Sequence, residues 1–171
     1  MTTVHLIEGP VGAGKSTYAR ALAGQTQGIH IALDAWFTRL FSPDRPASDV
    51  MAWYGARKER LIQLIWSHSQ NILAAGKEPI LELGLIQRQG RMAFCRQVQA
   101  AGFTPIMHVL DAPEAVRRAR VRRRNEEQGD TFSMVVPDAV FDMASAMWEA
   151  PDDAERRECE IDFAWWMDNA A

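Results

Sequence analysis

The chain has 171 residues, which is enough for one domain with a sizeable core and leaves no room for a second. Hydrophobic residues make up 47% of it and the formal net charge is −3, which argues against a general nucleic-acid binder because such proteins are usually basic. No apolar run is long enough to span a membrane and a strand is expected at the very start, so we expect no signal peptide, no membrane partner, and a cytoplasmic protein with free thiols at Cys95 and Cys159.

The first motif lies between a predicted strand and a predicted helix. Residues 4–7 form a short apolar run, and residues 17–23 have the spacing of a helix. Between them, residues 9–16 read Gly-Pro-Val-Gly-Ala-Gly-Lys-Ser and match the phosphate-binding loop (P-loop) pattern G-x-x-x-x-G-K-[ST]. A strand, a glycine-rich loop and a helix are the context that this motif requires, so the sequence predicts a nucleoside triphosphate site.

Each fixed position of the loop has a physical role on a triphosphate. Gly9 and Gly14 allow backbone dihedrals that a Cβ forbids, so that backbone N–H groups turn inward toward an anion. The start of the following helix adds its positive dipole end. We expect Lys15 to contact the β- and γ-phosphates and the Ser16 hydroxyl to ligate Mg²⁺. The predicted nucleotide-binding residues are Gly9, Pro10, Val11, Gly12, Ala13, Gly14, Lys15, Ser16 and Thr17.

The rest of the chain alternates strands and helices. Strands are predicted over residues 29–33, 79–83 and 105–110, with a weaker one at 158–163, and helices over about 49–75, 87–101, 113–127 and 137–148. This order predicts a single three-layer α/β/α domain over residues 1–171 with a mostly parallel five-stranded sheet. Ligands of such sheets bind outside the carboxyl ends of the strands.

Two acidic residues lie at predicted strand ends. Asp34 follows the second strand, where a carboxylate faces the γ-phosphate region and can accept a proton from a substrate hydroxyl. The alternative for Asp34 is a helix N-cap. Glu82 lies late in the third strand and is expected to hold Mg²⁺ or one of its waters, with a strand-end salt bridge to Lys15 or an arginine as the alternative.

Six arginines lie within eight positions of the predicted helix 113–127: Arg117, Arg118, Arg120, Arg122, Arg123 and Arg124. So many like charges are unfavourable unless anions face them, and a phosphoryl-transfer site supplies such anions. Arg117, Arg120 and Arg124 share one helical face, and Arg120 and Arg124 are the leading candidates for phosphate contacts. The alternatives are a solvated basic helix paired with nearby carboxylates and, third, a nucleic-acid patch, which the acidic balance disfavours.

Aromatic and basic residues after the second strand predict an acceptor pocket. Aromatic rings with a few polar groups suit a small molecule, and core packing is the alternative for each ring. Arg88 and Arg91 follow the third strand, where they either contact substrate or phosphate or lie on the helix surface. The predicted substrate residues are Asp34, Trp36, Arg39, Trp53, Arg57 and Arg88.

The chain resembles the small P-loop kinases and AAA-type ATP-binding proteins grouped with zeta toxins, polynucleotide kinase domains and chloramphenicol phosphotransferase. The resemblance rests on residues 9–17, on Asp34, on residues 110–113 (Leu-Asp-Ala-Pro) and on the arginine run that ends at residue 125. It implies a nucleoside kinase-like P-loop NTPase fold with an Arg-rich lid at about residues 117–131. The third strand departs from the group, since Glu82 stands where an aspartate followed by threonine and asparagine is common, which suggests a different acceptor.

The residues and the resemblance together predict a kinase that uses ATP and Mg²⁺ to phosphorylate a hydroxyl of a small molecule, as a monomer or homodimer. The resemblance implies ATP as the nucleotide, Asp34 as the base and a phosphate clamp by Arg120 or Arg124. The predicted catalytic residues are Lys15, Asp34, Arg120 and Arg124, and the predicted metal ligands are Ser16 and Glu82. Nucleic acid is not expected as a partner. The alternatives are a nucleotide-binding regulatory ATPase without an acceptor and a polynucleotide 5′-hydroxyl kinase.

Overall fold

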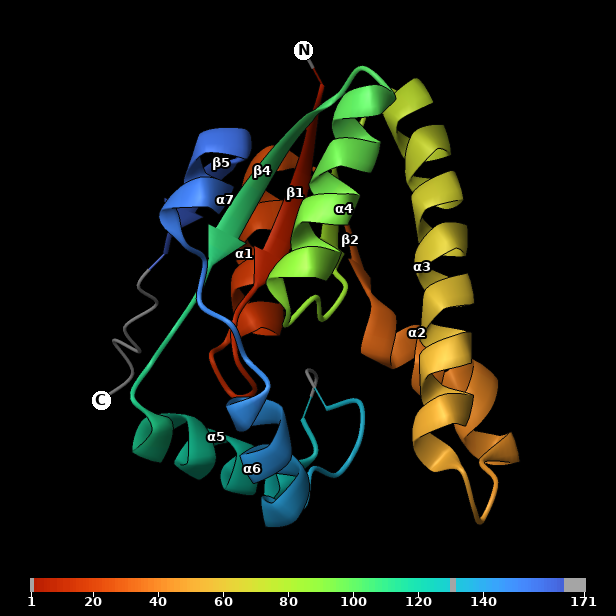
Figure 1. Cartoon of the computed structure of the whole chain (residues 1–171), viewed down its shortest axis with the longest axis vertical. Helices are drawn as coiled ribbons and strands as arrows, with labels where there is room; N and C mark the ends of the chain where they lie inside the picture. The colour runs from red at the N-terminus through yellow and green to blue at the C-terminus, as the bar shows by residue number, and fades with distance from the viewer. Residues whose placement is uncertain (1, 130–131, 165–171) are drawn as a thin grey trace.

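A computed structural model describes residues 2–129 and 132–164 (Figure 1). Its elements are β1 (Thr3–Glu8), α1 (Lys15–Thr26), β2 (Ile29–Ala32), α2 (Leu33–Phe41), the 3₁₀ turn η1 (Ser42–Asp44), α3 (Val50–Ala74), β3 (Pro79–Glu82), α4 (Arg88–Ala100), β4 (Thr104–Val109), α5 (Glu114–Glu127), α6 (Asp138–Ala146), α7 (Asp153–Glu158) and β5 (Glu160–Phe163). Residues 130 and 131 of the predicted lid lie outside the described residues.

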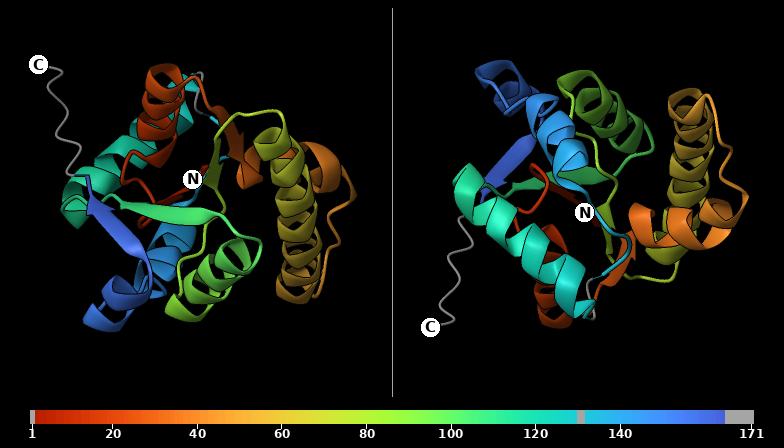
Figure 2. Two further views of the ribbon diagram at one scale, coloured as in Figure 1. Left: turned by 90° about the horizontal axis from the view of Figure 1, so that it is seen from above. Right: turned by 90° about the horizontal axis from the view of Figure 1, so that it is seen from below.

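The five strands form one parallel sheet in the order β2-β3-β1-β4-β5, which confirms the predicted architecture. The strand β1 lies at its centre, with His5 opposite Ile80 of β3 and Ile106 of β4. Because successive residues of a strand face opposite sides, Leu6 packs into the core beneath α3 and α4, whereas Ile7 packs beneath α1. Figure 2 shows these helices on the two faces of the sheet. Because the strands are parallel, their carboxyl ends all lie at one edge of the sheet, below β1 and β4 in Figure 1.

Two short helices differ from the predicted elements. The strand β2 ends at Ala32, one residue early, and α2 follows it directly with Leu33 and Phe37 buried on one face. The predicted N-cap role of Asp34 is therefore wrong, because Ala32 is the N-cap and Asp34 lies in the first helical turn. The helix α7 occupies residues 153–158, so the fifth strand begins at Glu160 rather than at residue 158.

A buried ion pair joins α4 to α7 and to the loop after β3. The Arg91 guanidinium donates to both carboxylate oxygens of Glu155, at 2.9 and 2.8 Å, and both side chains are 0% exposed. The same guanidinium also donates to the Leu85 and Ile86 carbonyl oxygens, at 3.3 and 3.1 Å. The expectation of Arg91 on the helix surface is therefore wrong, because Arg91 holds the β3–α4 loop from inside the protein.

The two cysteines are free and buried, and they lie together although 64 positions separate them in the chain. Cys95 of α4 and Cys159, which follows α7, have their Sγ atoms 3.0 Å apart. Within residues 2–129 and 132–164, no helix is long and apolar enough to cross a membrane.

Replacing Glu155 by Gln leaves the Arg91 charge buried without a counter-ion. We expect the free energy of unfolding to fall by about 3–5 kcal/mol, the usual result of breaking a buried ion pair. Glu158→Gln is the matched control, because Glu158 pairs with Arg96 on the surface and its loss is expected to cost less than about 1 kcal/mol. Urea unfolding of the two variants measures the difference, and equal losses would contradict a stabilising role of the buried pair.

Candidate active site

The glycine-rich loop between β1 and α1 is held by close backbone contacts. A Cβ on Gly9 would lie 2.3 Å from the Leu110 carbonyl oxygen, and a Cβ on Gly12 would lie 2.6 Å from the Arg117 carbonyl oxygen. Gly12 and Gly14 also have φ angles of +80° and +94°, in the region that side chains disfavour. The loop therefore packs against the end of β4 and against α5 at positions where only glycine fits.

The loop presents positive groups at the start of α1. Within the described residues, no protein acceptor receives the backbone N–H groups of Lys15, Ser16 and Thr17, as expected in the first turn of a helix. The Lys15 ammonium lies against the loop and donates to the carbonyl oxygens of Gly9 and Pro10, at 3.0 Å each. An anion at this position can accept from the free N–H groups and from Lys15, which is the chemistry of a phosphate site.

A cavity of about 200 Å³ opens between this loop and α5. Its lining residues are Gly12, Ala13, Gly14, Lys15, Ser16, Thr17, Glu82, Arg120, Val121, Arg123, Arg124, Glu127 and Gly129. Figure 1 shows α5 lying across the end of the sheet beside the loop. The structure therefore brings Arg120 and Arg124 to the predicted phosphate-binding loop.

The remaining arginines of α5 have structural partners. The Arg117 guanidinium donates to the carbonyl oxygens of Ala112 and Val11, at 3.0 Å each, and to the Ser145 hydroxyl at 3.1 Å. Arg118 and Arg122 form surface ion pairs with carboxylates of α6. The predicted solvated, ion-paired face thus describes Arg118 and Arg122, whereas Arg117 fastens α5 to the glycine-rich loop.

Arg124 of α5 lines the cavity and is influenced by two carboxylates. Its Nε atom is buried and has no hydrogen-bond partner within the part of the chain that the structure describes. Burial lowers the pKa of Arg124, and the charges of Asp34 and Glu82 oppose this shift, which places both carboxylates within electrostatic range. Arg124 therefore has an unused donor between the phosphate cavity and the strand ends.

Ser16 and Glu82 lie together as predicted for a pair of metal ligands. The Ser16 hydroxyl donates to Glu82 Oε1 at 2.9 Å, and His30 Nε2 donates to Oε2 at 3.3 Å, so the strand-end partner is a histidine rather than Lys15 or an arginine. Burial alone would raise the pKa of Glu82, but these hydrogen bonds and the Lys15 charge outweigh it and lower the pKa.

The donor set fits Mg²⁺ in one specific way. Within the described residues, no group of three or more His, Cys, Asp and Glu side chains could hold a metal ion. The hydroxyl of Ser16 and the carboxylate of Glu82 are hard oxygen ligands, and Mg²⁺ commonly takes one or two protein oxygens with water and phosphate oxygens completing its shell. The two residues therefore suit a magnesium ion that arrives with a triphosphate.

Asp34 is exposed in the first turn of α2. It makes no hydrogen bond or ion pair with any residue that the structure describes. The surrounding protein displaces water from the carboxylate, and this desolvation raises the pKa of Asp34, as does the Glu82 charge. The positive charges of Lys15, Lys58 and Arg124 act in the opposite direction. Its carboxylate is thus available to a ligand and lies within electrostatic range of the phosphate-side cations.

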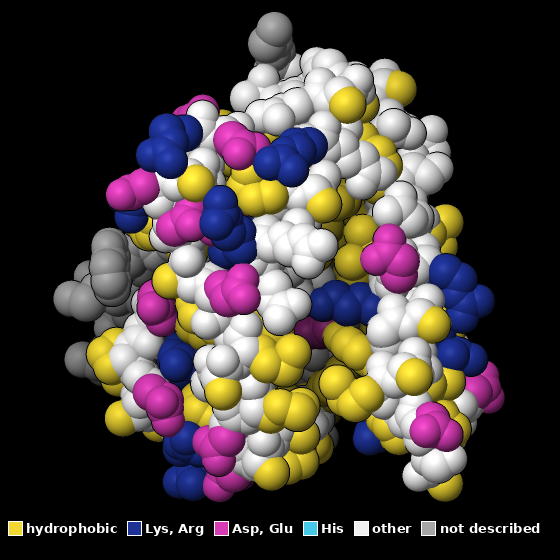
Figure 3. Space-filling view, in the orientation of Figure 1, with side chains coloured by type: hydrophobic (Ala, Val, Ile, Leu, Met, Phe, Trp, Pro, Cys, Tyr) yellow, Lys and Arg dark blue, Asp and Glu magenta, His cyan; other side chains and the backbone are white. Residues whose placement is uncertain are grey.

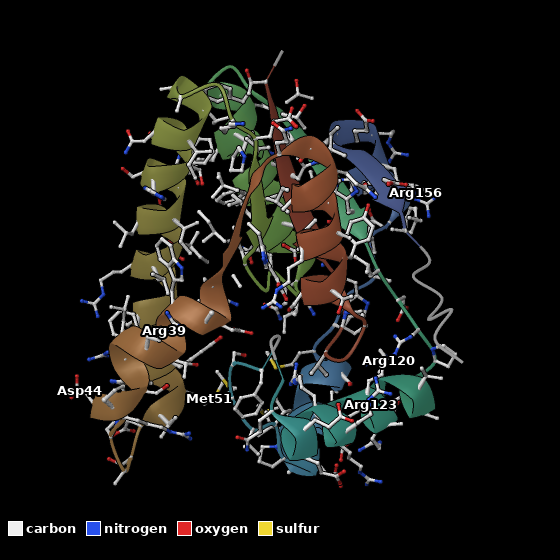
Figure 4. The ribbon with its side chains drawn as sticks, turned by 180° about the vertical axis from the view of Figure 1, so that it is seen from behind. Arg39, Asp44, Met51, Arg120, Arg123 and Arg156 are labelled. Carbon is white, nitrogen blue, oxygen red and sulfur yellow. The ribbon has the colours of Figure 1, made fainter. Side chains whose placement is uncertain are left out.

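The other predicted substrate residues do not line the phosphate cavity. Trp36 and Trp53 pack against the core, and the Arg57 guanidinium lies 4.7 Å from the Trp53 ring centroid. Figure 4 shows Arg39 on α2, on the side of the molecule away from α5 with Arg120 and Arg123. Arg88 is exposed and pairs with Asp152 at 3.0 Å. Asp34 does not line the cavity either, but it lies within electrostatic range of Lys15, Glu82 and Arg124, which do.

Two charged residues of the site were missed in the sequence. Glu8 ends β1 directly before the glycine-rich loop, is 0% exposed, and accepts from the Leu85 N–H at 3.1 Å. The strand-end rule that selected Asp34 and Glu82 applies equally to Glu8. Lys58 of α3 donates to the Gly84 carbonyl oxygen at 2.7 Å. Its position four residues after Tyr54 and three before Leu61, on the inward face of the helix, is the signal that could have identified it.

Comparison with known proteins adds three findings. The profile of a family described as an AAA domain matches residues 4–151. No protein of curated function matches the sequence. Many solved structures match the fold, and three of them are described below.

A sugar kinase from Janibacter sp. HTCC2649 has 18% identity and a TM-score of 0.61, over 96% of this chain and 85% of that one. Kti12 from Chaetomium thermophilum, solved with ADP-AlF3, has 15% identity and a TM-score of 0.71, over 98% and 91% of the two chains. A chain of the Pnkp1/Rnl/Hen1 RNA repair complex has 16% identity and a TM-score of 0.65, over 85% of this chain and 43% of that one. These likenesses show the P-loop kinase-like fold.

The buried carboxyl of Glu8 makes stability depend on pH. Burial raises its pKa from 4.5 to about 7, against the opposing charges of Lys15, Arg91 and Lys58. Between those two pH values the unfolded chain has lost the proton that the folded chain keeps. Stability should therefore fall as pH rises from about 4.5 to 7, by up to about 3 kcal/mol.

In Glu8→Gln this component should disappear, so that the variant gains stability relative to the natural chain as pH rises from 5 to 8. Urea unfolding at several pH values measures the difference. Glu126→Gln, an exposed residue of α5, is the control and should keep the natural pH dependence. Parallel curves for Glu8→Gln and the natural chain would contradict the raised pKa.

Proposed function

This chain belongs to the AAA domain family, and on that premise we propose that it is an ATP-dependent kinase that transfers the γ-phosphoryl group to a hydroxyl of a small molecule. The observation that carries the proposal is Asp34, an exposed carboxylate without a protein partner in the described residues, within electrostatic range of Lys15, Glu82 and Arg124, which line the phosphate-type cavity. A protein that only binds or hydrolyses ATP does not need such an unpaired carboxylate there. The sugar kinase with the same fold supports a small-molecule acceptor.

The glycine-rich loop binds the β- and γ-phosphates in this proposal. The N–H groups of Lys15, Ser16 and Thr17 donate to phosphate oxygens, and the Lys15 ammonium exchanges the Gly9 and Pro10 carbonyl oxygens for them. Mg²⁺, held by Ser16 and Glu82, would supply charge neutralisation between the β- and γ-phosphates. The protein groups around the cavity then fix the orientation of the γ-phosphate.

Asp34 acts on the acceptor. Its carboxylate accepts the proton of the acceptor hydroxyl as that oxygen bonds to the γ-phosphorus, while the bond from phosphorus to the bridging oxygen of ADP breaks. Arg124, with its unused Nε donor, and Arg120 on the same face of α5 neutralise the charge on the transferring group. Closure of residues 120–129 over the cavity would exclude water and suppress hydrolysis.

Asp34→Asn tests the proposed base. ADP release with Mg²⁺-ATP is measured across nucleosides, sugars, aminoglycosides, chloramphenicol and oligonucleotide ends. We expect one acceptor class to stimulate the natural chain, and the stimulated rate to fall by about 10²- to 10⁴-fold in Asp34→Asn. The affinity for a fluorescent ATP analogue should stay unchanged. Asp44→Asn, an exposed carboxylate on η1, is the matched control and should retain full activity.

Other outcomes of this panel select the other functions. ATP binding with no acceptor effect and no difference for Asp34→Asn would favour a regulatory nucleotide-binding protein. Stimulation by oligonucleotide ends alone, with a steep loss of activity in salt, would favour a polynucleotide kinase.

The raised pKa of Asp34 predicts an acid limb in the pH profile. A base must be deprotonated, so kcat/KM should fall as pH drops through the pKa of Asp34, above the ordinary value of 3.8. Arg124→Met removes a neighbouring positive charge and should move this limb to higher pH. Arg122→Met alters an exposed arginine of the same helix that pairs with Asp138 and does not line the cavity, and should not move it. A limb that stays in place or moves down in Arg124→Met would contradict Asp34 as the titrating base.

A further inference from the structure

One peptide group of the β3–α4 loop is held between a lysine and a buried glutamate. The carbonyl oxygen of Gly84 accepts from Lys58 Nζ at 2.7 Å. The N–H of the same peptide unit, which belongs to Leu85, donates to Glu8 Oε2 at 3.1 Å. Gly84 has a φ angle of +62°, which favours glycine at this turn. A cation of α3 and a carboxylate of β1 are thus joined through a single polarised peptide.

This arrangement orients Lys58 while leaving most of its donors unused. An ammonium group has three N–H donors, and only the Gly84 carbonyl oxygen accepts from Lys58 within the described residues. The charges of Asp34 and Glu8 act on Lys58, yet no ion pair joins it to either carboxylate. Two N–H donors therefore remain for a ligand within electrostatic range of Asp34.

Lys58 bridges two elements on the Asp34 side of the sheet. Its hydrogen bond runs from α3 to the loop after β3, across the space between the α2–α3 unit and the sheet. Figure 3 shows this side of the molecule hollowed beside α3, with a Lys or Arg side chain crossing the hollow and an acidic side chain behind it. The Lys58 ammonium is partly buried with one protein acceptor in the described residues, whereas compensating a charge removed from water usually takes several partners.

We propose that Lys58 binds a second oxygen of the acceptor, adjacent to the hydroxyl that Asp34 deprotonates. The inference rests on the proposed kinase function and names its substrate class: compounds with two neighbouring oxygens, such as vicinal diols and 2-hydroxy acids. Asp34 accepts a proton from one oxygen, and Lys58 donates to the other. A monohydroxy compound can satisfy only one of these two groups. Glu8, through the Gly84–Leu85 peptide, is the positioning residue that keeps Lys58 in place.

The first test observes Lys58 directly, without catalysis. The chain has three lysines, Lys15, Lys58 and Lys77, so lysine-selective NMR of the ammonium groups gives a spectrum that Lys58→Met and Lys77→Met assign. The complex with a non-hydrolysable ATP analogue is titrated with glycerol, ribose and glycerate, and in parallel with 1-propanol. The Lys58 signal should shift with the two-oxygen compounds and not with 1-propanol, while Lys77 stays unchanged. A Lys58 signal that none of the two-oxygen compounds moves would overturn the proposal.

The second test is kinetic and uses the acceptor that the panel identifies, together with its analogue lacking the neighbouring oxygen. Lys58→Met should raise KM for the two-oxygen acceptor about 10- to 100-fold, the usual effect of losing a hydrogen bond to a charged group. It should leave KM for the analogue and the affinity for ATP unchanged. Lys77→Met is the matched control, since Lys77 is exposed after α3. Lys58→Arg keeps the positive charge and should raise KM for the two-oxygen acceptor less than Lys58→Met does.

The two tests separate this inference from the kinase proposal. Equal losses on both acceptors, or a loss of ATP affinity, would assign Lys58 to folding or to phosphate binding and overturn its role toward the acceptor. A Lys58 signal that responds to diols without phosphoryl transfer would refute the kinase alone. Phosphoryl transfer that Lys58→Met leaves unchanged would refute the inference alone. Thermal melting of each variant controls for misfolding.

Discussion

The whole site depends on close backbone packing around the glycine-rich loop. Where β1 ends, the carbonyl groups of Leu110 and Arg117 occupy the space that side chains at Gly9 and Gly12 would need. This packing fixes the loop relative to the end of β4 and to the first turns of α5. The start of α1, with its free N–H groups, and the arginines of α5 then face each other across one cavity. Close contacts between uncharged backbone groups at Gly9 and Gly12 thus help to position the charged side chains that line the cavity.

Three carboxylates at strand ends have different chemistry because their surroundings differ. Glu8 is sealed beneath the loop and its pKa is raised to about 7, whereas Glu82 receives hydrogen bonds from Ser16 and His30 that lower its pKa. Asp34 is exposed in the first turn of α2 and has no partner in the described residues. A buried carboxyl suits positioning, a hydrogen-bonded one suits a cation, and an accessible one suits proton transfer. The same functional group therefore has three different chemical environments near one edge of the sheet.

Local sequence patterns predicted the parallel sheet, the glycine-rich loop, the contact between Ser16 and Glu82, and Arg120 and Arg124 beside the phosphate cavity. They missed α2 and α7, because α2 follows β2 without a glycine or proline and α7 has only six residues. Partnerships across the fold were beyond local patterns: Arg91 is a basic residue of a predicted surface helix until Glu155, 64 positions later, is known to meet it. For Trp36 and Trp53, periodicity cannot distinguish a pocket wall from a core.

The anchoring of Arg117 sets the reach of α5. Its guanidinium donates to the Val11 carbonyl oxygen, so the first turns of the helix are tied to the glycine-rich loop. Because each residue of an α-helix advances about 1.5 Å, Arg120 and Arg124 follow this anchor by about 4.5 and 10 Å along the helix axis. The two arginines of the cavity are therefore spaced from the loop by the helix itself, as marks on a ruler whose zero is Arg117.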